Sequence, residues 1–263
     1  MSSAQGHRSD PRVLNRRTVE RDHRGLLEHL YPGQRVLDVG CGTGSITAGI
    51  ARLVSPGGEV VGMDRDATLL EIARENHGTQ EGLRFEQGDV LELLASASFD
   101  VVTAARVLQW SADPGKALLR MKEATTPGGL VVVLDYNHAE NTWDPAPPAE
   151  FQAFYRAFLD WRTVNGWSNQ MASELPDLFR QAGLVVRQTR NCEERVARGD
   201  ADFEQAVSIW ADVVESLGPA MVTAGFLSED QRLAAARVYR AWIGAGLMSQ
   251  TLSLWTVTGR NGS

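Results

Sequence analysis

Three closely spaced glycines form the stretch of this chain that is best suited to hold a ligand. Gly40, Gly42 and Gly44 alternate with other residues, and the first of them is two residues after the acidic residue Asp38. Glycine adopts positive φ angles without a steric penalty, and its missing side chain lets a bound molecule approach the main chain. The pattern therefore predicts a tight turn on which a small ligand rests.

The sequence around this turn predicts a strand, the turn and a helix in direct succession. Residues 35–39 read as a short apolar strand, and Ser45 opens a segment to residue 54 with apolar residues on one helical face. Such a unit begins a doubly wound α/β sheet. The helix directs its free N–H groups and the positive end of its dipole toward the ligand.

Polar or small residues also follow the next three predicted strands. Asp64 follows a strand over residues 59–63, and its carboxylate can accept hydrogen bonds from both hydroxyls of a ribose. Asp89 follows a strand over residues 83–87, and a fourth strand covers residues 99–104. Since ligands of open α/β sheets bind at the carboxyl ends of the strands, these residues are expected to share one site.

Together these motifs resemble those of the class I S-adenosylmethionine (SAM)-dependent methyltransferases, in particular the small-molecule group that includes the quinone-biosynthesis enzymes. The resemblance covers roughly 100 residues, from Arg35 to Asp135. It implies that the glycine turn holds the methionine part of SAM, that successive strand ends hold the ribose and the adenine, and that the run after the fourth strand passes beside the sulfonium. The residues so assigned are Asp38, Gly40, Cys41, Gly42 and Gly44 (methionine part), Asp64 (ribose), Asp89 and Val90 (adenine), and Arg106 (sulfonium, mainly through its backbone), with Arg65 as a further cofactor-binding residue.

A nicotinamide dehydrogenase is the alternative for the same turn. Its fingerprint is G-x-G-x-x-G, because a pyrophosphate must sit on the helix N-terminus. Here the spacing is G-x-G-x-G, and Ser45 follows the last glycine. SAM has no phosphate; it brings a carboxylate to the helix start and an ammonium that Asp38 can balance. The spacing therefore favours a methyltransferase.

The predicted fold class is α/β, a doubly wound, Rossmann-like, seven-stranded and mostly parallel sheet with a helical cap built from insertions. Further strands are expected at 130–134, 184–189 and 250–258, and further helices at 13–30, 149–162, 173–182, 202–217 and 229–244. The predicted domains are an N-terminal helical cover (1–30), a SAM-binding core (31–135), an aromatic-rich lid insertion (136–172) and the C-terminal part of the core (173–263) with a helical insertion at about 200–247. The family's last two strands are adjacent along the chain, whereas about fifty residues separate them here.

Three of the predicted helices have recognisable starts. Asp66 can cap the helix that follows the second strand. Asp113 precedes Pro114, which is favoured in the first turn of a helix. Ser228 and Gln231 have the spacing of a capping box.

The residues that would bind and activate the acceptor are less clearly marked. His138 follows the fifth predicted strand and is the candidate general base, although a lone histidine is more often structural. Trp110 stands where the family often has histidine. Tyr155 and Trp161 lie in an aromatic helical segment that forms either an acceptor wall or the core of a lid. No His, Cys and Asp cluster has metal-ligand spacing, so no metal is predicted.

Composition limits the partners and the location. The chain of 263 residues has a net charge of −7, which argues against a broad nucleic-acid footprint. Its N-terminus lacks the apolar core of a signal peptide, and the longest obvious apolar strand, 130–134, is far too short to span a bilayer. A soluble cytoplasmic protein without membrane insertion is expected. Its two cysteines, Cys41 and Cys192, suggest no disulfide framework.

The sequence therefore predicts a SAM-dependent methyltransferase that acts on a small, apolar or planar acceptor. One alternative is a SAM-binding protein of the same fold that does not methylate and serves ligand sensing or another reaction. An RNA or protein methyltransferase fits the acidic charge less well. O-, N- and C-methylation and the oligomeric state stay open.

Overall fold

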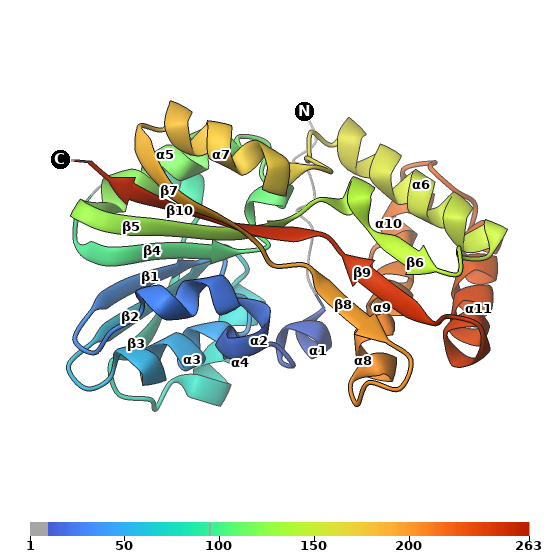
Figure 1. Cartoon of the computed structure of the whole chain (residues 1–263), viewed down its shortest axis with the longest axis horizontal. Coiled ribbons are helices and arrows are strands. Elements are labelled where there is room, and N and C mark those ends of the chain that lie inside the picture. The colour runs from blue at the N-terminus through green and yellow to red at the C-terminus, as the bar shows by residue number, and fades with distance from the viewer. Residues whose placement is uncertain (1–9, 95, 263) are drawn as a thin grey trace. The chain divides into compact units, whose positions relative to one another are not determined.

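The computed structural model describes residues 10–94 and 96–262, and these form two compact units. The core unit comprises Pro11–Tyr136, Met171–Cys192 and the chain from Leu254 onward. The insert unit comprises Asn137–Gln170 and Glu193–Ser253. Two segments far apart in the sequence, which contain the two predicted insertions of the helical cap, thus build one unit (Figure 1).

The core unit is built on a seven-stranded sheet, as predicted. The strands are β1 (Arg35–Val39), β2 (Glu59–Asp64), β3 (Leu83–Gln87), β4 (Phe99–Ala105), β5 (Thr125–Tyr136), β7 (Leu184–Asn191) and β10 (Leu254–Asn261). Their order is β3-β2-β1-β4-β5-β10-β7. The first five pair in parallel, and β10 lies antiparallel between β5 and β7. The strand order reverses between β1 and β4, which is the switch point where ligands bind in such sheets.

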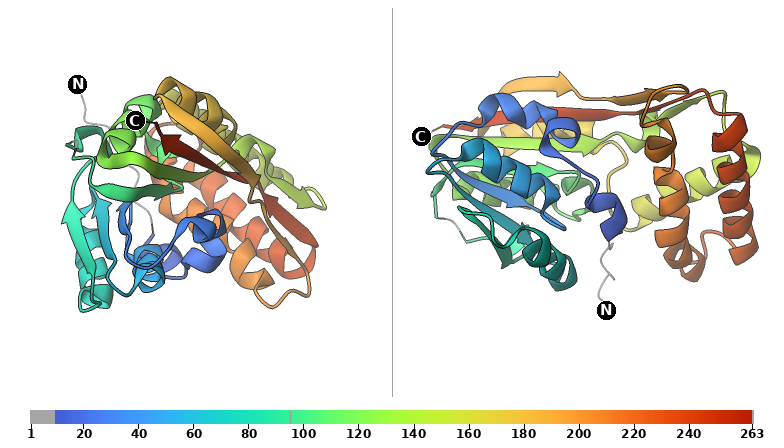
Figure 2. Two further views of the ribbon diagram at one scale, coloured as in Figure 1. Left: turned by 60° about the vertical axis from the view of Figure 1, so that its left-hand side comes forward. Right: turned by 90° about the horizontal axis from the view of Figure 1, so that it is seen from below.

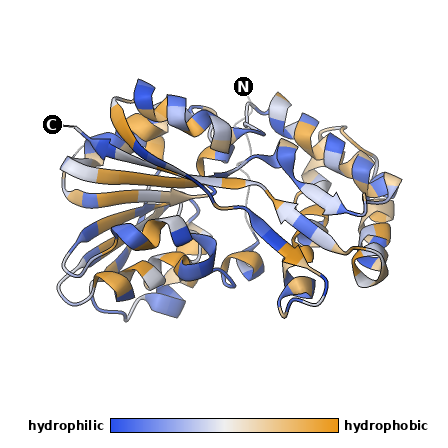
Figure 3. Ribbon diagram, in the orientation of Figure 1, coloured by the Kyte–Doolittle hydropathy of each residue, from blue (hydrophilic) through white to orange (hydrophobic). Residues whose placement is uncertain are grey.

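Helices cover both faces of this sheet (Figure 2). The helices of the core unit are α1 (Pro11–Leu14), α2 (Val19–Asp22), α3 (Ser45–Val54), α4 (Ala67–His77), α5 (Pro114–Ala124) and α7 (Met171–Gln181), with 3-10 turns η1 (Arg24–His29), η2 (Val90–Glu92) and η3 (Leu108–Trp110). Successive strand residues point to opposite faces. Leu37 and Val39 therefore join the cluster under α5 and α7, whereas Val36 joins the cluster under α3 and α4. Burial on both faces explains why β4 and β5 are mostly apolar (Figure 3).

The predicted helix starts are confirmed. Asp66 accepts hydrogen bonds from the N–H groups of Thr68 and Leu69 at the start of α4. Asp113 accepts one from the N–H of Lys116. The capping box of Ser228 and Gln231 is present at the start of α11 (Glu229–Ala245).

The predicted single helix over residues 13–30 is wrong, because this segment contains three short helices. Thr18 is extended, and its hydroxyl caps α2 by accepting the N–H of Arg21. Asp22 returns a hydrogen bond by accepting the N–H of Thr18 at 2.8 Å. His23 then leaves the helical conformation and bonds to Thr103 on β4. Apolar spacing suggested one helix, but local capping and anchoring to the sheet interrupt it.

The insert unit combines a small sheet with helices. Its strands β6 (Thr142–Asp144), β9 (Ser249–Leu252) and β8 (Glu194–Ala197) pair antiparallel in the order β6-β9-β8. Its helices are α6 (Ala149–Val164), α8 (Phe203–Val207), α9 (Ile209–Ser216), α10 (Gly218–Thr223) and α11, with the 3-10 turn η4 (His138–Glu140). The prediction of one helix over 202–217 is wrong, since α8 and α9 are separate; the Tyr239 hydroxyl donates to the Val207 carbonyl where α8 ends.

The predicted last strand over residues 250–258 is divided between the two units. The Ser253 N–H donates to Asn141 Oδ1 at 2.8 Å, and the Ser253 carbonyl accepts the N–H of Asn137 at 2.9 Å. These bonds take Ser253 out of strand pairing. Consequently β9 belongs to the small sheet and β10 to the seven-stranded sheet. Within residues 10–94 and 96–262, every helix is too short or too polar to cross a bilayer.

Two adjacent leucines of α5 test the packing of the core unit. Leu118 is completely buried, whereas its neighbour Leu119 is 41% exposed. We expect Leu118→Ala to lower the free energy of unfolding by about 2–5 kcal/mol, because it removes buried methyl groups and leaves a cavity. The matched control Leu119→Ala should change it by less than about 1 kcal/mol. Urea denaturation of both variants measures the difference; equal losses would contradict the described orientation of α5.

Candidate functional site

The glycine turn lies at the carboxyl ends of β1 and β2. The N–H groups of Gly40 and Cys41 both donate to the Met63 carbonyl, at 2.7 and 3.0 Å, which ties the turn to the end of β2. The φ angles are +69° for Gly40, +56° for Gly42 and +78° for Gly44. All three glycines therefore occupy the left-handed region, as the sequence predicts.

Neighbouring side chains crowd the turn so closely that no side chain would fit there. A β-carbon on Gly40 would lie 2.5 Å from a methyl group of Val107. A β-carbon on Gly44 would lie 2.6 Å from the ring of Phe85. The glycines are thus required both by backbone conformation and by packing.

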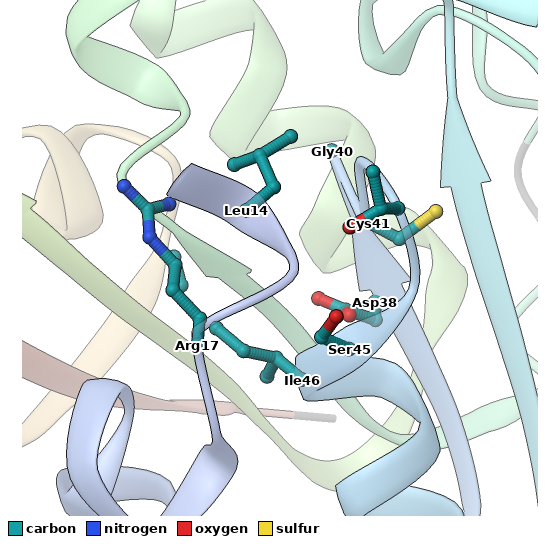
Figure 4. A pocket seen from close by; sticks show the side chains of 9 residues that line it. Leu14, Arg17, Asp38, Gly40, Cys41, Ser45 and Ile46 are labelled. Carbon is teal, nitrogen blue, oxygen red and sulfur yellow. The ribbon is translucent and has the colours of Figure 1, made fainter. Parts of the chain in front are cut away.

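A pocket opens beside the turn (Figure 4). Its wall includes Asp38, Thr43 and Ser45 from β1, the turn and the start of α3, and Leu14 from α1. The Thr43 hydroxyl is buried and has no hydrogen-bond partner among residues 10–94 and 96–262. Since a buried polar atom usually has a partner, this hydroxyl suits a polar ligand group.

Asp38 is the acidic residue of the pocket wall, which also includes the basic residue Arg17. The carboxyl group is buried, and its Oδ2 accepts a hydrogen bond from the Thr47 hydroxyl at 2.6 Å. Burial raises the pKa of Asp38 to about 7; the Thr47 hydrogen bond opposes this shift, and the nearby Asp64 carboxylate adds to it. A cation bound in the pocket would favour the ionised form and lower this pKa.

The Asp64 carboxylate supports the turn and can accept further hydrogen bonds from a ligand. Its Oδ2 accepts the N–H of Gly42 at 2.8 Å, and its Oδ1 accepts the N–H of Asp66 at 2.9 Å. An ionised carboxylate oxygen can accept more than one hydrogen bond, so both oxygens can still bind hydroxyl groups. The half-buried side chain lies at the end of β2, next to the turn.

The residues predicted to flank the ribose and the adenine lie at the neighbouring strand ends. The Gly88 N–H donates to the Asp64 carbonyl at 3.0 Å, which brings the ends of β2 and β3 together. Asp89 caps η2 by accepting the N–H of Leu91 at 2.9 Å. Val90 packs partly buried against the core, and Arg65 is exposed.

Cys41 is part of the turn, but its thiol is not activated. Burial raises the pKa of the Cys41 thiol, and the Asp38 and Asp64 carboxylates raise it further. The neutral thiol is a poor nucleophile. Its sulfur points away from Asp38 in Figure 4.

Arg106 does not line the pocket with its side chain, whereas its neighbour Ala105 is part of the pocket wall. The buried guanidinium of Arg106 donates to the Asp22 carbonyl at 2.6 Å and to the Tyr136 hydroxyl at 3.1 Å. Trp110 is half-buried at the end of η3, in the core unit.

The other predicted acceptor residues belong to the insert unit. His138 is buried, and its ring meets Phe158 and Trp210 edge to face. Burial, and then the charge of Arg162, hold the pKa of His138 well below its ordinary value, so the imidazole is neutral at pH 7. The Tyr155 hydroxyl donates to the His138 carbonyl at 2.6 Å.

Trp161 is also buried in the insert unit, and its ring packs edge to face on Trp167 at 5.2 Å between centroids. Together with the ring contacts of Tyr155 and His138, this packing favours the interpretation of the aromatic segment as the core of the insert unit. The role of these residues toward an acceptor stays a prediction.

The core-unit residues fit SAM, the donor that the sequence resemblance implies. The turn lets a ligand approach the main chain, Thr43 offers an unused buried hydroxyl, and the two acids suit an ammonium and a ribose. Sequence reasoning missed the support that Thr47 gives to Asp38. Within the predicted N-terminal cover (1–30) it did not single out Leu14 and Arg17, which line the pocket, because no motif connects them with the turn.

Comparisons with known proteins agree with this geometry. A family model described as a methyltransferase domain matches residues 30–183. Trans-aconitate 2-methyltransferase of Deinococcus radiodurans is 37% identical over 153 residues, which cover 56% of this chain and 56% of that protein. The chain thus spans little more than half the length of this relative. Demethylmenaquinone methyltransferase of Staphylococcus aureus is 30% identical over 183 residues, covering 63% of this chain and 73% of that protein.

A solved structure from Bacillus halodurans, assigned as a methyltransferase, superposes with a TM-score of 0.58 at 16% identity. The match covers 92% of this chain and 99% of that one, and at this identity it supports the fold alone. The family match extends over more than half of the chain, and it includes the glycine turn and the first five strands of the sheet. The chain therefore belongs to the methyltransferase-domain family and has the fold of the class I SAM-dependent methyltransferases.

Proposed function

We propose that this protein transfers a methyl group from SAM to a small-molecule acceptor. The observation that carries the proposal is the convergence of the glycine turn, the buried Asp38 carboxyl and the Asp64 carboxylate at adjacent strand ends. The names of the two relatives refer to trans-aconitate and demethylmenaquinone, which are both small molecules. This supports a small-molecule acceptor here.

Each end of the donor has a complementary group in the core unit. Asp38 would balance the ammonium of SAM, and the N-terminus of α3 would receive its carboxylate. Asp64 would accept hydrogen bonds from the ribose, and Asp89 with Val90 would border the adenine. When bound, SAM supplies an electrophilic methyl group on a sulfonium. The protein then needs to orient the acceptor and to exclude water, without a covalent intermediate.

The acceptor side stays a set of predictions within this proposal. A flat or apolar acceptor would suit the aromatic residues Trp110, Tyr155 and Trp161. His138 stays the candidate general base for a hydroxyl acceptor, but burial lowers the pKa of its imidazole and so makes it a weaker base than an exposed histidine. A cytoplasmic location also belongs to the proposal.

Formation of S-adenosylhomocysteine (SAH) is the direct test of the function. We expect the protein to bind SAM in calorimetry and to release SAH when it is offered a panel of small acids, quinols, phenols and amines. A protein that does not bind SAM would contradict the proposal. Binding of SAM without SAH release for any acceptor class would favour the alternative of a SAM-binding protein that does not methylate.

The ribose assignment predicts a specific loss at Asp64. Asp64→Ala should weaken SAM binding by roughly 2–4 kcal/mol, because charge-assisted hydrogen bonds to two hydroxyls are lost. Asp66→Ala is the matched control: it removes the cap of α4 and should cost about 1 kcal/mol of stability while SAM affinity is kept. Calorimetry and thermal melting on both variants measure the two effects. Unchanged affinity in a folded Asp64→Ala variant would refute the assignment.

The raised pKa of Asp38 predicts a pH-dependent affinity. Since this pKa is about 7, the carboxyl group of the free protein becomes protonated as the pH falls below neutral. SAH affinity should then fall roughly tenfold between about pH 7.5 and about pH 6, because the ammonium loses its counter-charge. Asp38→Asn should bind weakly with a flat pH profile, since its amide does not titrate. If SAH affinity changed with pH in the same way in the wild-type protein and in Asp38→Asn, the pairing of Asp38 with the ammonium group would be contradicted.

The raised pKa of Asp38 also makes the free energy of unfolding depend on pH. The folded pKa of Asp38, about 7, lies above the ordinary value of 3.8. Protonated Asp38 therefore stabilises the fold fully below about pH 4, and this contribution is lost as the pH rises through about 7. The Asn variant should lack this part of the pH dependence, which urea denaturation at several pH values can measure.

A further inference from the structure

Arg106 has a backbone conformation that is unusual for its residue type. Its φ angle is +63°, in the left-handed region that residues with a β-carbon rarely adopt. The residue directly follows β4, and its N–H donates to the Leu134 carbonyl of β5 at 2.7 Å. Such strained positions persist only where surrounding contacts hold them, and they are concentrated at functional sites.

The bend at Arg106 places both of its neighbours at the proposed donor site. Ala105, on one side, is part of the pocket wall. Val107, on the other side, fills the space where Gly40 lacks a side chain. A change in the conformation of residue 106 would therefore move two of the surfaces that shape the glycine turn and its pocket.

Contacts of the guanidinium hold this bend from inside the core unit. Nη1 donates to the Asp22 carbonyl at 2.6 Å, and Nε donates to the Tyr136 hydroxyl at 3.1 Å. Nη2 lies 3.9 Å from Asp22 Oδ1, with the Arg106 side chain 3% exposed and that of Asp22 10% exposed. The planar fork of arginine allows it to reach α2 and the end of β5 at the same time.

Asp22 extends these contacts to the segment that borders the pocket. Its Oδ2 accepts the N–H of Thr18 at 2.8 Å. Next to it, His23 Nε2 lies 2.7 Å from the Thr103 hydroxyl, which itself donates to the Val132 carbonyl. The histidine must therefore donate this bond, and it fixes the end of α2 to β4. Leu14, a few residues earlier on α1, is part of the pocket wall.

We propose that Arg106 is a positioning residue, which locks the segment from α1 to His23 onto the ends of β4 and β5 and so preforms the donor pocket. The inference rests on the proposed function, because it assumes that SAM occupies this pocket. Arg106 acts through Ala105, Val107 and Leu14 rather than by touching the donor with its side chain.

The test compares Arg106→Lys with the matched control Arg180→Lys. Lysine keeps the charge of Arg106 but cannot bond to Asp22 and Tyr136 with a planar fork. Arg180 is an exposed residue of α7 that pairs with Asp177, so its replacement by lysine should leave the SAH affinity unchanged. We expect calorimetry with SAH to show an affinity loss of about tenfold or more for Arg106→Lys, since bonds to a charged donor are lost. Tyr136→Phe, which removes the hydroxyl that accepts from Nε and leaves the bond to Asp22 in place, should give a smaller loss and serves as the milder variant.

Two further readouts separate positioning from a general loss of stability. Hydrogen exchange of the amides between α1 and His23 should become faster in Arg106→Lys, while that of β1 and α3 stays unchanged. In Arg106→Gly, which tolerates the positive φ but lacks the guanidinium, millimolar methylguanidinium should restore part of the SAH affinity. The added cation should have no effect on Arg180→Lys.

The outcomes distinguish this inference from the proposed function. If the wild-type protein binds SAH and folded Arg106→Lys and Tyr136→Phe bind it equally well, Arg106 is not a positioning residue, and the donor site stands. If exchange rises throughout the core unit together with the affinity loss, Arg106 is merely structural. If the wild-type protein binds neither SAM nor SAH, the proposed function fails, whatever the variants do.

Discussion

Close packing of side chains against the main chain of the glycine turn is the constraint on which the rest of the core unit depends. Gly40 and Gly44 leave no room for a β-carbon, because Val107 and Phe85 occupy that space. The same turn is bonded to the Met63 carbonyl and to the Asp64 carboxylate. Strands β1, β2 and β4 can therefore end side by side only if the turn consists of residues that tolerate positive φ. This arrangement brings the acids of β1 and β2 to one pocket.

The electrostatics of the pocket follow from this packing. Asp38 is buried next to a second carboxylate, so its ionised form is disfavoured in the free protein. The Thr47 hydroxyl compensates only in part. A positively charged ligand group next to Asp38 would favour the ionised carboxylate, whereas a phosphate next to Asp38 would disfavour it further. The charge of Asp38 thus suits the ammonium group of an amino-acid ligand such as SAM.

In the insert unit, the packing of aromatic rings against one another forms the core. The spacing of Phe151, Phe154, Tyr155 and Phe158 indicated the helix α6 correctly. It could not show which rings are enclosed, because their partners come from segments far away in the sequence. Trp210, for instance, contacts both Tyr155 and Phe158 from α9. A hydrogen bond from Tyr155 to a main-chain carbonyl likewise has no signature in the sequence.

Sequence alone determined the features that depend on neighbouring residues: the glycine turn, the helix caps of Asp66 and Asp113, and the strands whose apolar runs demand burial. It could also place Asp64 at a strand end, since the chain order of the βα units implies the common edge. Only the tertiary structure decided that the predicted helix over residues 13–30 is divided into shorter helices and that β10 lies between β5 and β7. It also decided that Arg106 bonds to Asp22 and Tyr136. These features depend on contacts between distant residues, and local propensity and periodicity carry no information about such contacts.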